Sequence, residues 1–276
     1  MIKRIFIFIL FVFLVGCGGP RIEKFNICPG KPTLNDSVTA MRTNAKVLPF
    51  SAQGRCLATI YDNNKKRKEN FSVRLWFNPP KELRLFGEFP FNPRGLDIGS
   101  NEKDFWFAAK PRELGNSFAW GLWQEQQEFV ADLGPKIILE AFGSITFDKD
   151  ADWFLSNEGH FDILTLKTQD RIVKKIYIYS CDYRVRKIEY FYGKGSLSLV
   201  LELSNYSIRF DGCSFASQML IRLLHTDRKE DSFKIIFKTV SAFEYTADKR
   251  HGRARVGFSP YRRKQHRRRI GSRFRS

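Results

Sequence analysis

The sequence predicts a mainly β domain built on one curved, meandering antiparallel sheet of about ten to twelve strands with two helices. Apolar and polar residues alternate with a period of two through most of residues 50–243. Short turn sequences rich in Asn, Asp, Gly and Pro separate the alternating segments. A helical period appears in only two stretches, so the sequence lacks the regular alternation of strands and helices that builds a parallel sheet.

The first helical stretch follows a leader that contains Gly and Pro. Asn35 or Asp36 is the expected cap at its start. Its apolar residues recur at steps of three and four, which places them on one face of an amphipathic helix. They are Leu34, Val38, Met41, Ala45 and Leu48.

Strands are expected next, and a second helix interrupts them. Asp132 is the expected cap of this helix, Pro135 lies in its first turn, and Gly143 ends it. The tight turns between the later strands imply antiparallel neighbours. The early strands include Phe71–Phe77, Leu83–Leu85 and Phe118–Leu122, and the later ones are Gly159–Lys167, Arg171–Ser180, Arg184–Tyr192, Ser196–Asn205, Gln218–Leu224 and Ser232–Phe243.

One apolar face of such a sheet has to be covered, and two helices are too few to cover all of it. We therefore expect an apolar hollow that the helices partly close, and a core filled by side chains is the alternative. The candidate lining residues are Val38, Met41, Phe71, Val73, Leu75, Phe77, Leu83, Leu85, Phe105, Phe107, Phe118, Trp120, Leu122, Ile137 and Ile138.

The chain begins with a signal-peptide pattern. Lys3 and Arg4 precede 11 apolar residues, Ile5 to Val15, a run too short to span a hydrocarbon layer about 30 Å thick. Leu14-Val15-Gly16-Cys17 then resembles the lipobox of bacterial lipoproteins. The alternative is a plain secretory signal in which the Cys occurs by chance.

The lipobox resemblance implies that residues 1–16 are removed and that Cys17 carries diacylglycerol and a further acyl group such as palmitate. Stable anchoring takes two acyl chains, so this lipid holds the protein on a membrane without a transmembrane helix. Gly18 stands where an inner-membrane retention signal usually has Asp. The implied location is the bacterial cell envelope, lipid-anchored to the outer membrane and facing the periplasm, with residues 17–32 as the tether.

Positive charge gathers at the other end of the chain. The formal charge is +18, and residues 249–276 hold 12 Lys and Arg and no acid. We expect a disordered basic tail there that binds anionic lipid headgroups. Nucleic acid would bind it only non-specifically, and export makes that partner unexpected. The alternatives are a solvated tail without a partner and a shifted reading frame.

Four cysteines remain besides the lipid-bearing one: Cys28, Cys56, Cys181 and Cys213. An oxidising compartment permits two disulfides among them, with three connectivities. Buried free thiols are the alternative, and the sequence does not decide between the two.

The layout resembles the LolA/LolB superfamily of periplasmic lipoprotein carriers. The resemblance covers about residues 33–245 and rests on a lipobox and an N-terminal helix followed by loose strand patterns. These patterns are Phe50-Ser51-Ala52-Gln53-Gly54, the stretch from Leu75 to Leu85, Gly95 to Asn101, Phe105-Trp106-Phe107 and a helix near Gly134-Pro135. The resemblance implies a half-open antiparallel β-barrel with helical lids over residues 33–248, whose hollow holds acyl chains.

LolB-type receptors carry an apolar residue on a protruding loop that helps deliver cargo into the membrane. Phe89 and Phe91 occupy that place here, and the alternative is that both rings pack into the core. The Arg that latches the lid of LolA-type soluble carriers has no counterpart, because Asn78 and Pro79 stand at its position. The resemblance therefore favours the anchored receptor type.

Catalytic motifs are absent from the sequence, which has no GxSxG, HExxH, Walker or GxGxxG pattern. Glu158, His160 and Asp162 alternate on one strand, and we interpret them as a solvated face rather than as metal ligands. The sequence thus predicts no enzyme, no metal and no cofactor other than the covalent lipid on Cys17.

The predicted function is that of a monomeric, membrane-anchored lipoprotein that binds acylated cargo, either lipoproteins or lipids, and delivers it to the outer membrane. A soluble periplasmic carrier is the expected donor. The alternative is a structural or assembly lipoprotein of the envelope with a filled core and no cargo.

Overall fold

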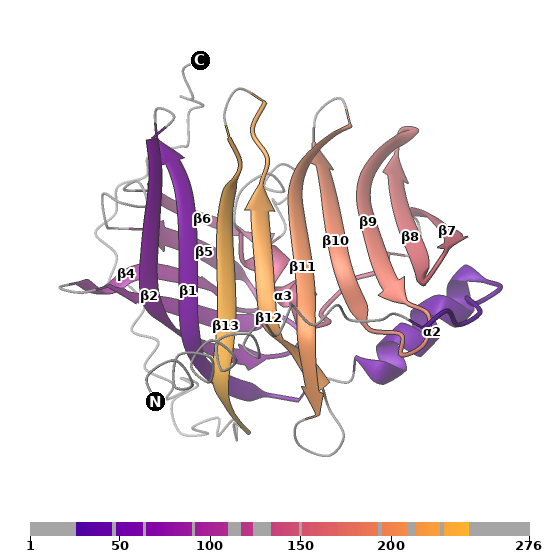
Figure 1. The fold of residues 1–276 in the computed structure, drawn as a ribbon, viewed down its shortest axis with the longest axis horizontal. Coiled ribbons are helices and arrows are strands. Elements are labelled where there is room, and N and C mark those ends of the chain that lie inside the picture. The colour runs from indigo at the N-terminus through magenta and orange to yellow at the C-terminus, as the bar shows by residue number, and fades with distance from the viewer. Residues whose placement is uncertain are drawn as a thin grey trace, which may run out of the picture.

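The computed structural model describes residues 26–45, 48–62, 65–89, 92–109, 117–123, 134–148, 151–192, 195–208, 214–226 and 229–242. In these residues the chain forms one 13-stranded antiparallel sheet and two helices, as Figure 1 shows. The predicted fold class is confirmed, with slightly more strands than expected. No helix in this part of the chain is long and apolar enough to cross a membrane.

The helices are α2 (Leu34–Asn44) and α3 (Pro135–Ala141). The strands are β1 (Phe50–Asp62), β2 (Lys65–Asn78), β3 (Glu82–Phe89), β4 (Asn92–Ser100), β5 (Asp104–Ala109), β6 (Ser117–Leu122), β7 (Asp152–Glu158), β8 (Phe161–Thr168), β9 (Arg171–Tyr179), β10 (Val185–Tyr192), β11 (Ser196–Ile208), β12 (Ser214–Leu223) and β13 (Asp231–Ala242).

The sheet is built outward from its middle. Strand β1 pairs with both β2 and β13, and the strand order is β6-β5-β4-β3-β2-β1-β13-β12-β11-β10-β9-β8-β7. The chain therefore runs from the centre to the β6 edge, crosses to the β7 edge through α3, and returns to the centre. The two edges do not pair, so the sheet stays open.

Helix α3 covers the inner face of the curled sheet. In Figure 1 the strands β4 to β6 pass behind β1, β13 and β12, because the sheet bends back on itself. Helix α3 contacts β4 and β5 on one half of the sheet and β11 on the other. The segment that links the two edges in sequence thus also bridges the two halves of the sheet.

An aromatic cluster lies where α3 meets the sheet. The ring centroid of Phe50 on β1 is 5.4 Å from that of Phe77, 5.1 Å from that of Phe215 and 5.4 Å from that of Phe142. Phe142 directly follows α3 and is also 6.0 Å from Phe237. These rings attach the end of α3 to four different strands of the inner face.

The helix starts differ from the expected ones. Thr33 is the N-cap of α2, and its hydroxyl accepts a hydrogen bond from the backbone N–H of Asp36 at 3.2 Å, so neither Asn35 nor Asp36 is the cap. The N-cap of α3 is Gly134, which has no side chain to cap the helix, and the helix begins at Pro135. The proposed cap Asp132 lies outside the described residues.

The β6 strand corrects part of the predicted hollow. Trp120 pairs with Trp106 and Leu122 pairs with Asp104, so both residues occupy outward register positions, whereas the side chain of Phe118 lies outside the described part. Trp120 is 51% exposed. Trp120 and Leu122 therefore do not line the inner face.

Gly121 takes an inward position of β6 instead. A Cβ added at Gly121 would come within 2.5 Å of the ring of Phe105, its partner on β5. The inner face here is filled by a ring from the neighbouring strand. Trp120 of β6 therefore lies on the outer face.

Candidate functional site

The inner face brings most of the predicted lining residues together. Those on α2, β2, β3 and α3, and Phe105 on β5, are all buried, with exposures of 0 to 7%. Phe107 is half-buried against the same core. In this structure the apolar face is therefore covered by α3 and by its own side chains. The fully covered residues are Val38, Met41, Phe71, Val73, Leu75, Phe77, Leu83, Leu85, Phe105, Ile137 and Ile138.

A buried polar group fastens α3 to this apolar face. Glu140 of α3 is 2% exposed, and Lys174 Nζ donates to its two carboxylate oxygens at 2.8 and 3.0 Å. The hydroxyl of Tyr190 donates to the same carboxylate at 2.6 Å. Lys174 on β9 and Tyr190 on β10 are register partners that face inward. We call Glu140, Lys174 and Tyr190 the inner trio.

The protonation of Tyr190 suits its role as a donor in the inner trio. Burial raises the pKa of Tyr190 well above its ordinary value, and the nearby Glu140 carboxylate raises it further. The hydroxyl therefore keeps its proton across the physiological range. The Glu140 carboxylate is thereby held by one ammonium and one hydroxyl in an apolar surrounding, where such bonds are strong.

Sequence reasoning missed the inner trio. Its signal was Glu140 itself, an acidic residue within the apolar stretch Ile137-Ile138-Leu139-Glu140-Ala141. A carboxylate on a buried helix face needs partners. The identity of those partners depends on how α3 meets β9 and β10, which lie 34 and 50 residues further along the chain.

A second trio of the same residue types lies on the opposite face of the same two strands. Lys187 and Tyr177 are register partners on β10 and β9, and both bond to Glu189, at 2.7 and 2.8 Å. Glu189 belongs to β10 itself, and the Lys187 side chain is 32% exposed. We call these residues the outer trio, and they provide a matched control for the inner one.

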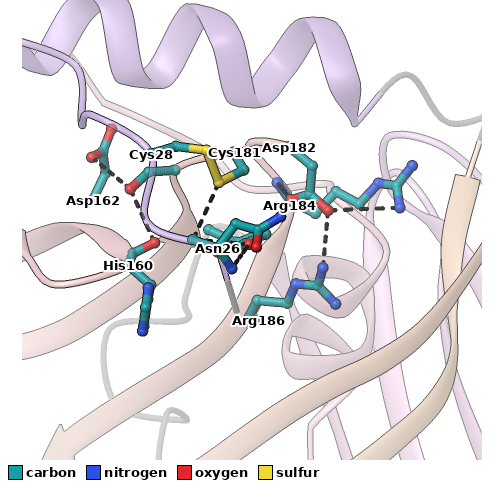
Figure 2. The surroundings of a disulfide bond; sticks show 10 residues. Asn26, Cys28, His160, Asp162, Cys181, Asp182, Arg184 and Arg186 are labelled. Atoms are coloured by element: carbon teal, nitrogen blue, oxygen red, sulfur yellow. Dashed lines mark hydrogen bonds and ion pairs between the residues drawn. A yellow bond between two sulfur atoms is a disulfide. The ribbon is translucent and has the colours of Figure 1, made fainter. Parts of the chain in front are cut away.

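The leader is strapped to the end of strands β8 to β10. Cys28 forms a disulfide with Cys181, 153 residues away, as Figure 2 shows. Two residues before Cys28, the backbone N–H of Asn26 donates to the Tyr179 hydroxyl at 2.9 Å, and that hydroxyl donates back to the Asn26 carbonyl at 3.1 Å. We call this attachment of Asn26 and Cys28 the strap.

Asp162 completes the attachment of the leader and of α2. Its carboxylate accepts bonds from the Lys31 backbone N–H at 3.1 Å, the Ser37 hydroxyl at 3.1 Å and the Asn157 amide at 2.8 Å. Asp162 is fully buried, so the expectation of a solvated face was wrong for this residue. In the part of the chain that the structure describes, no group of three His, Cys, Asp or Glu could hold a metal ion.

Cys56 is a free, buried thiol on β1, so it does not take part in a second disulfide. Cys213 lies outside the described residues. Of the two alternatives left open for the cysteines, a disulfide therefore describes Cys28 and Cys181, and a buried free thiol describes Cys56.

Cys56 is expected to resist alkylation in the folded protein. Burial raises the pKa of its thiol to about 12, so almost none of the reactive thiolate is present at pH 8. Mass spectrometry after iodoacetamide treatment should find Cys56 unmodified in buffer and fully modified in denaturant. Rapid modification in buffer would contradict the burial of Cys56 on β1.

Phe89 does not protrude from the sheet. It lies at the end of β3, half-buried, and its ring stacks on Phe71 of β2 with centroids 4.2 Å apart. This packing corresponds to the alternative in which the ring joins the core. Phe91 lies outside the described residues, as do Cys17, the signal segment 1–16 and the basic tail 249–276.

Comparisons with known proteins place the fold. No protein-family model and no curated protein matches the sequence significantly. A LolA superfamily protein from Nitrosomonas europaea aligns with a TM-score of 0.51 over 78% of this chain and 96% of that chain, at 12% sequence identity. A DUF1329 family protein from Desulfovibrio piger aligns with a TM-score of 0.50 over 82% of this chain and 95% of that chain, at 14% identity. The resemblance to the LolA/LolB superfamily is therefore confirmed at the level of the fold.

Proposed function

We propose that this protein is an envelope lipoprotein that binds the acyl chains of its cargo between the inner face of the sheet and helix α3, and releases them at the outer membrane. Cargo binding and release involve no covalent step. The observation that carries the proposal is an open sheet whose two edges stay unpaired while a seven-residue helix bridges its apolar inner face.

The energetics allow helix α3 to open and close over the inner face. Removing the apolar surface of an acyl chain from water is favourable by about 25 cal/mol for each Å². The inner face offers such burial once α3 moves. Helix α3 is short, and its attachment consists of apolar contacts and the inner trio. Acyl chains would replace apolar contacts of α3 with similar ones, so exchange costs less than exposing the face to water.

The strapped leader suits a membrane tether. In the proposed mature protein the lipid is on Cys17, nine residues before Asn26, where the strap begins. Nine residues reach at most about 30 Å, at roughly 3.5 Å each. The end of the sheet that holds the strap therefore stays close to the membrane surface. Delivery of cargo from a soluble periplasmic donor requires this proximity.

A structural envelope lipoprotein without cargo is the second candidate. The observation that favours it is the packing of the inner face, where Leu75, Leu164, Ile176 and Ile188 are 0% exposed. In that case α3 is a permanent part of the core, and the protein contributes its surface rather than a binding site.

Uptake of an acyl probe distinguishes the two candidates. The mature chain, with Cys17→Ser so that it carries no lipid of its own, should bind a neutral fluorescent acyl probe in a saturable way. Long-chain lipids added in excess should displace the probe. Mass spectrometry of natively purified protein should also find co-purified acyl lipids. Absence of saturable binding together with lipid-free native protein would reject the carrier function in favour of the structural one.

A further inference from the structure

Lys174 and Tyr190 form a polar site on the inner face of the sheet, among mostly apolar neighbours. Lys174 is the only buried lysine among the residues that the structure describes. It is 7% exposed, and Tyr190 is 1% exposed. Around them the inward positions of β8 to β11 carry apolar residues such as Leu164, Ile176 and Leu201.

The hydrogen-bond partner of Lys174 and Tyr190 comes from helix α3, which covers the inner face, rather than from the sheet. Glu140 belongs to α3, so any movement that uncovers the inner face also withdraws its carboxylate from Lys174 and Tyr190. The outer trio differs in this respect, because Glu189 is on the same strand as Lys187 and cannot leave it. Opening of α3 therefore creates an unpaired ammonium and an unpaired hydroxyl donor inside an apolar site.

An unpaired buried charge is costly in free energy. This cost favours ligands that can pair with the charge. A neutral acyl chain that displaced α3 would leave Lys174 without a counter-charge, which weakens its binding relative to that of an acidic ligand. A ligand with an anionic headgroup would instead restore both bonds. A binding site discriminates against a ligand that leaves its buried polar groups unpaired.

We propose that Lys174 and Tyr190 form an anion-binding subsite for the headgroup of an acidic amphiphile, and that Glu140 occupies this subsite in the unliganded protein. The ligand class is an acyl chain that ends in a carboxylate or a phosphate. Both headgroups present an oxygen pair to one ammonium and one hydroxyl, as the Glu140 carboxylate does here. This inference rests on the acyl-binding function proposed above and specifies the ligand for it.

In this proposal the headgroup of the ligand takes the place of the Glu140 carboxylate. Two variants should therefore have opposite effects on the affinity for acidic ligands. Lys174→Met removes the cation while keeping a side chain of similar length, so acidic ligands should lose their advantage. Glu140→Gln removes the competing charge, so acidic ligands should bind more tightly than they do to the wild type. A purely structural role of the trio would not produce this opposition, because both variants would then weaken binding.

Three ligands with one chain length test the proposal: laurate, dodecyl phosphate and dodecanol, each titrated into the mature Cys17→Ser chain by displacement of a neutral acyl probe. Each acid should bind the wild type at least about tenfold more tightly than dodecanol. Lys174→Met should abolish this preference without weakening dodecanol. Lys187→Met of the outer trio should leave all three affinities unchanged. Preference for only one of the two acids would identify the headgroup as carboxylate or phosphate.

The outcomes separate this inference from the function on which it rests. Equal binding of all three ligands overturns the anion subsite and leaves acyl binding intact. Binding of none of them overturns both. The double variant Glu140→Gln with Lys174→Met guards against unfolding, because it contains no unpaired charge. It should bind dodecanol and show no acid preference, and a retained preference there would also overturn the subsite.

Discussion

Glu140→Ala is expected to lower the free energy of unfolding by about 3 to 5 kcal/mol, the range for removing one partner of a buried ion pair. The variant leaves the Lys174 ammonium and the Tyr190 hydroxyl without their acceptor in a site where both residues are less than 10% exposed. Urea denaturation of the mature chain measures this loss.

The outer trio supplies the control for this loss. Glu189→Ala removes the same residue type from the same kind of partners, but the Lys187 side chain is 32% exposed and water can solvate it. We expect a loss of about 1 kcal/mol or less. Similar losses for the two variants would show that the buried position of Glu140 does not matter and would contradict the account of the inner trio.

Replacing the whole inner trio has a different expected result. Glu140→Leu, Lys174→Met and Tyr190→Phe together remove every polar group of the site, and such replacements are often neutral or stabilising. If this triple variant is as stable as the wild type, the trio is retained for something other than stability. Ligand selection by Lys174 and Tyr190 is the role that we propose for it.

The alternation of apolar residues predicted the sheet well, because long antiparallel strands with one buried face impose a strict period of two. The later strands lie within a few residues of their predicted ranges, as β9 (Arg171–Tyr179) and β10 (Val185–Tyr192) show. The inward parity of Phe71 to Phe77 was also correct. These features depend on local pattern alone.

The pattern failed where both parities are apolar or where a partner lies far away in sequence. On β6, the alternation placed Trp120 among the lining residues, yet the space inside is taken by the ring of Phe105 from β5. The partners of Asp162 come from the leader, α2 and β7, so its burial was invisible in an alternating strand. The pairing of Cys28 with Cys181 depends in the same way on how the leader returns to the sheet.

Removing the Cys28–Cys181 disulfide is expected to lower the free energy of unfolding by about 2 to 4 kcal/mol. The bond joins residues 153 positions apart, so it restricts the unfolded chain over most of its folded length. The double variant Cys28→Ser with Cys181→Ser, compared with the wild type in urea, measures the effect. The dependence on urea should also steepen, because an unfolded chain without the cross-link exposes more surface.

A reductant distinguishes the effect of the disulfide bond from the effect of replacing the two cysteine side chains. Dithiothreitol should destabilise the wild type by nearly as much as the double serine substitution does, and it should have no effect on the double variant. Cys56→Ala keeps the disulfide, so it should respond to dithiothreitol in full. In the reduced protein the leader would still be held by hydrogen bonds that include those of Asn26 with Tyr179 and of Lys31 with Asp162. If reduction leaves the stability of the wild type unchanged, the hydrogen bonds suffice and the disulfide is not what fastens the leader to the sheet.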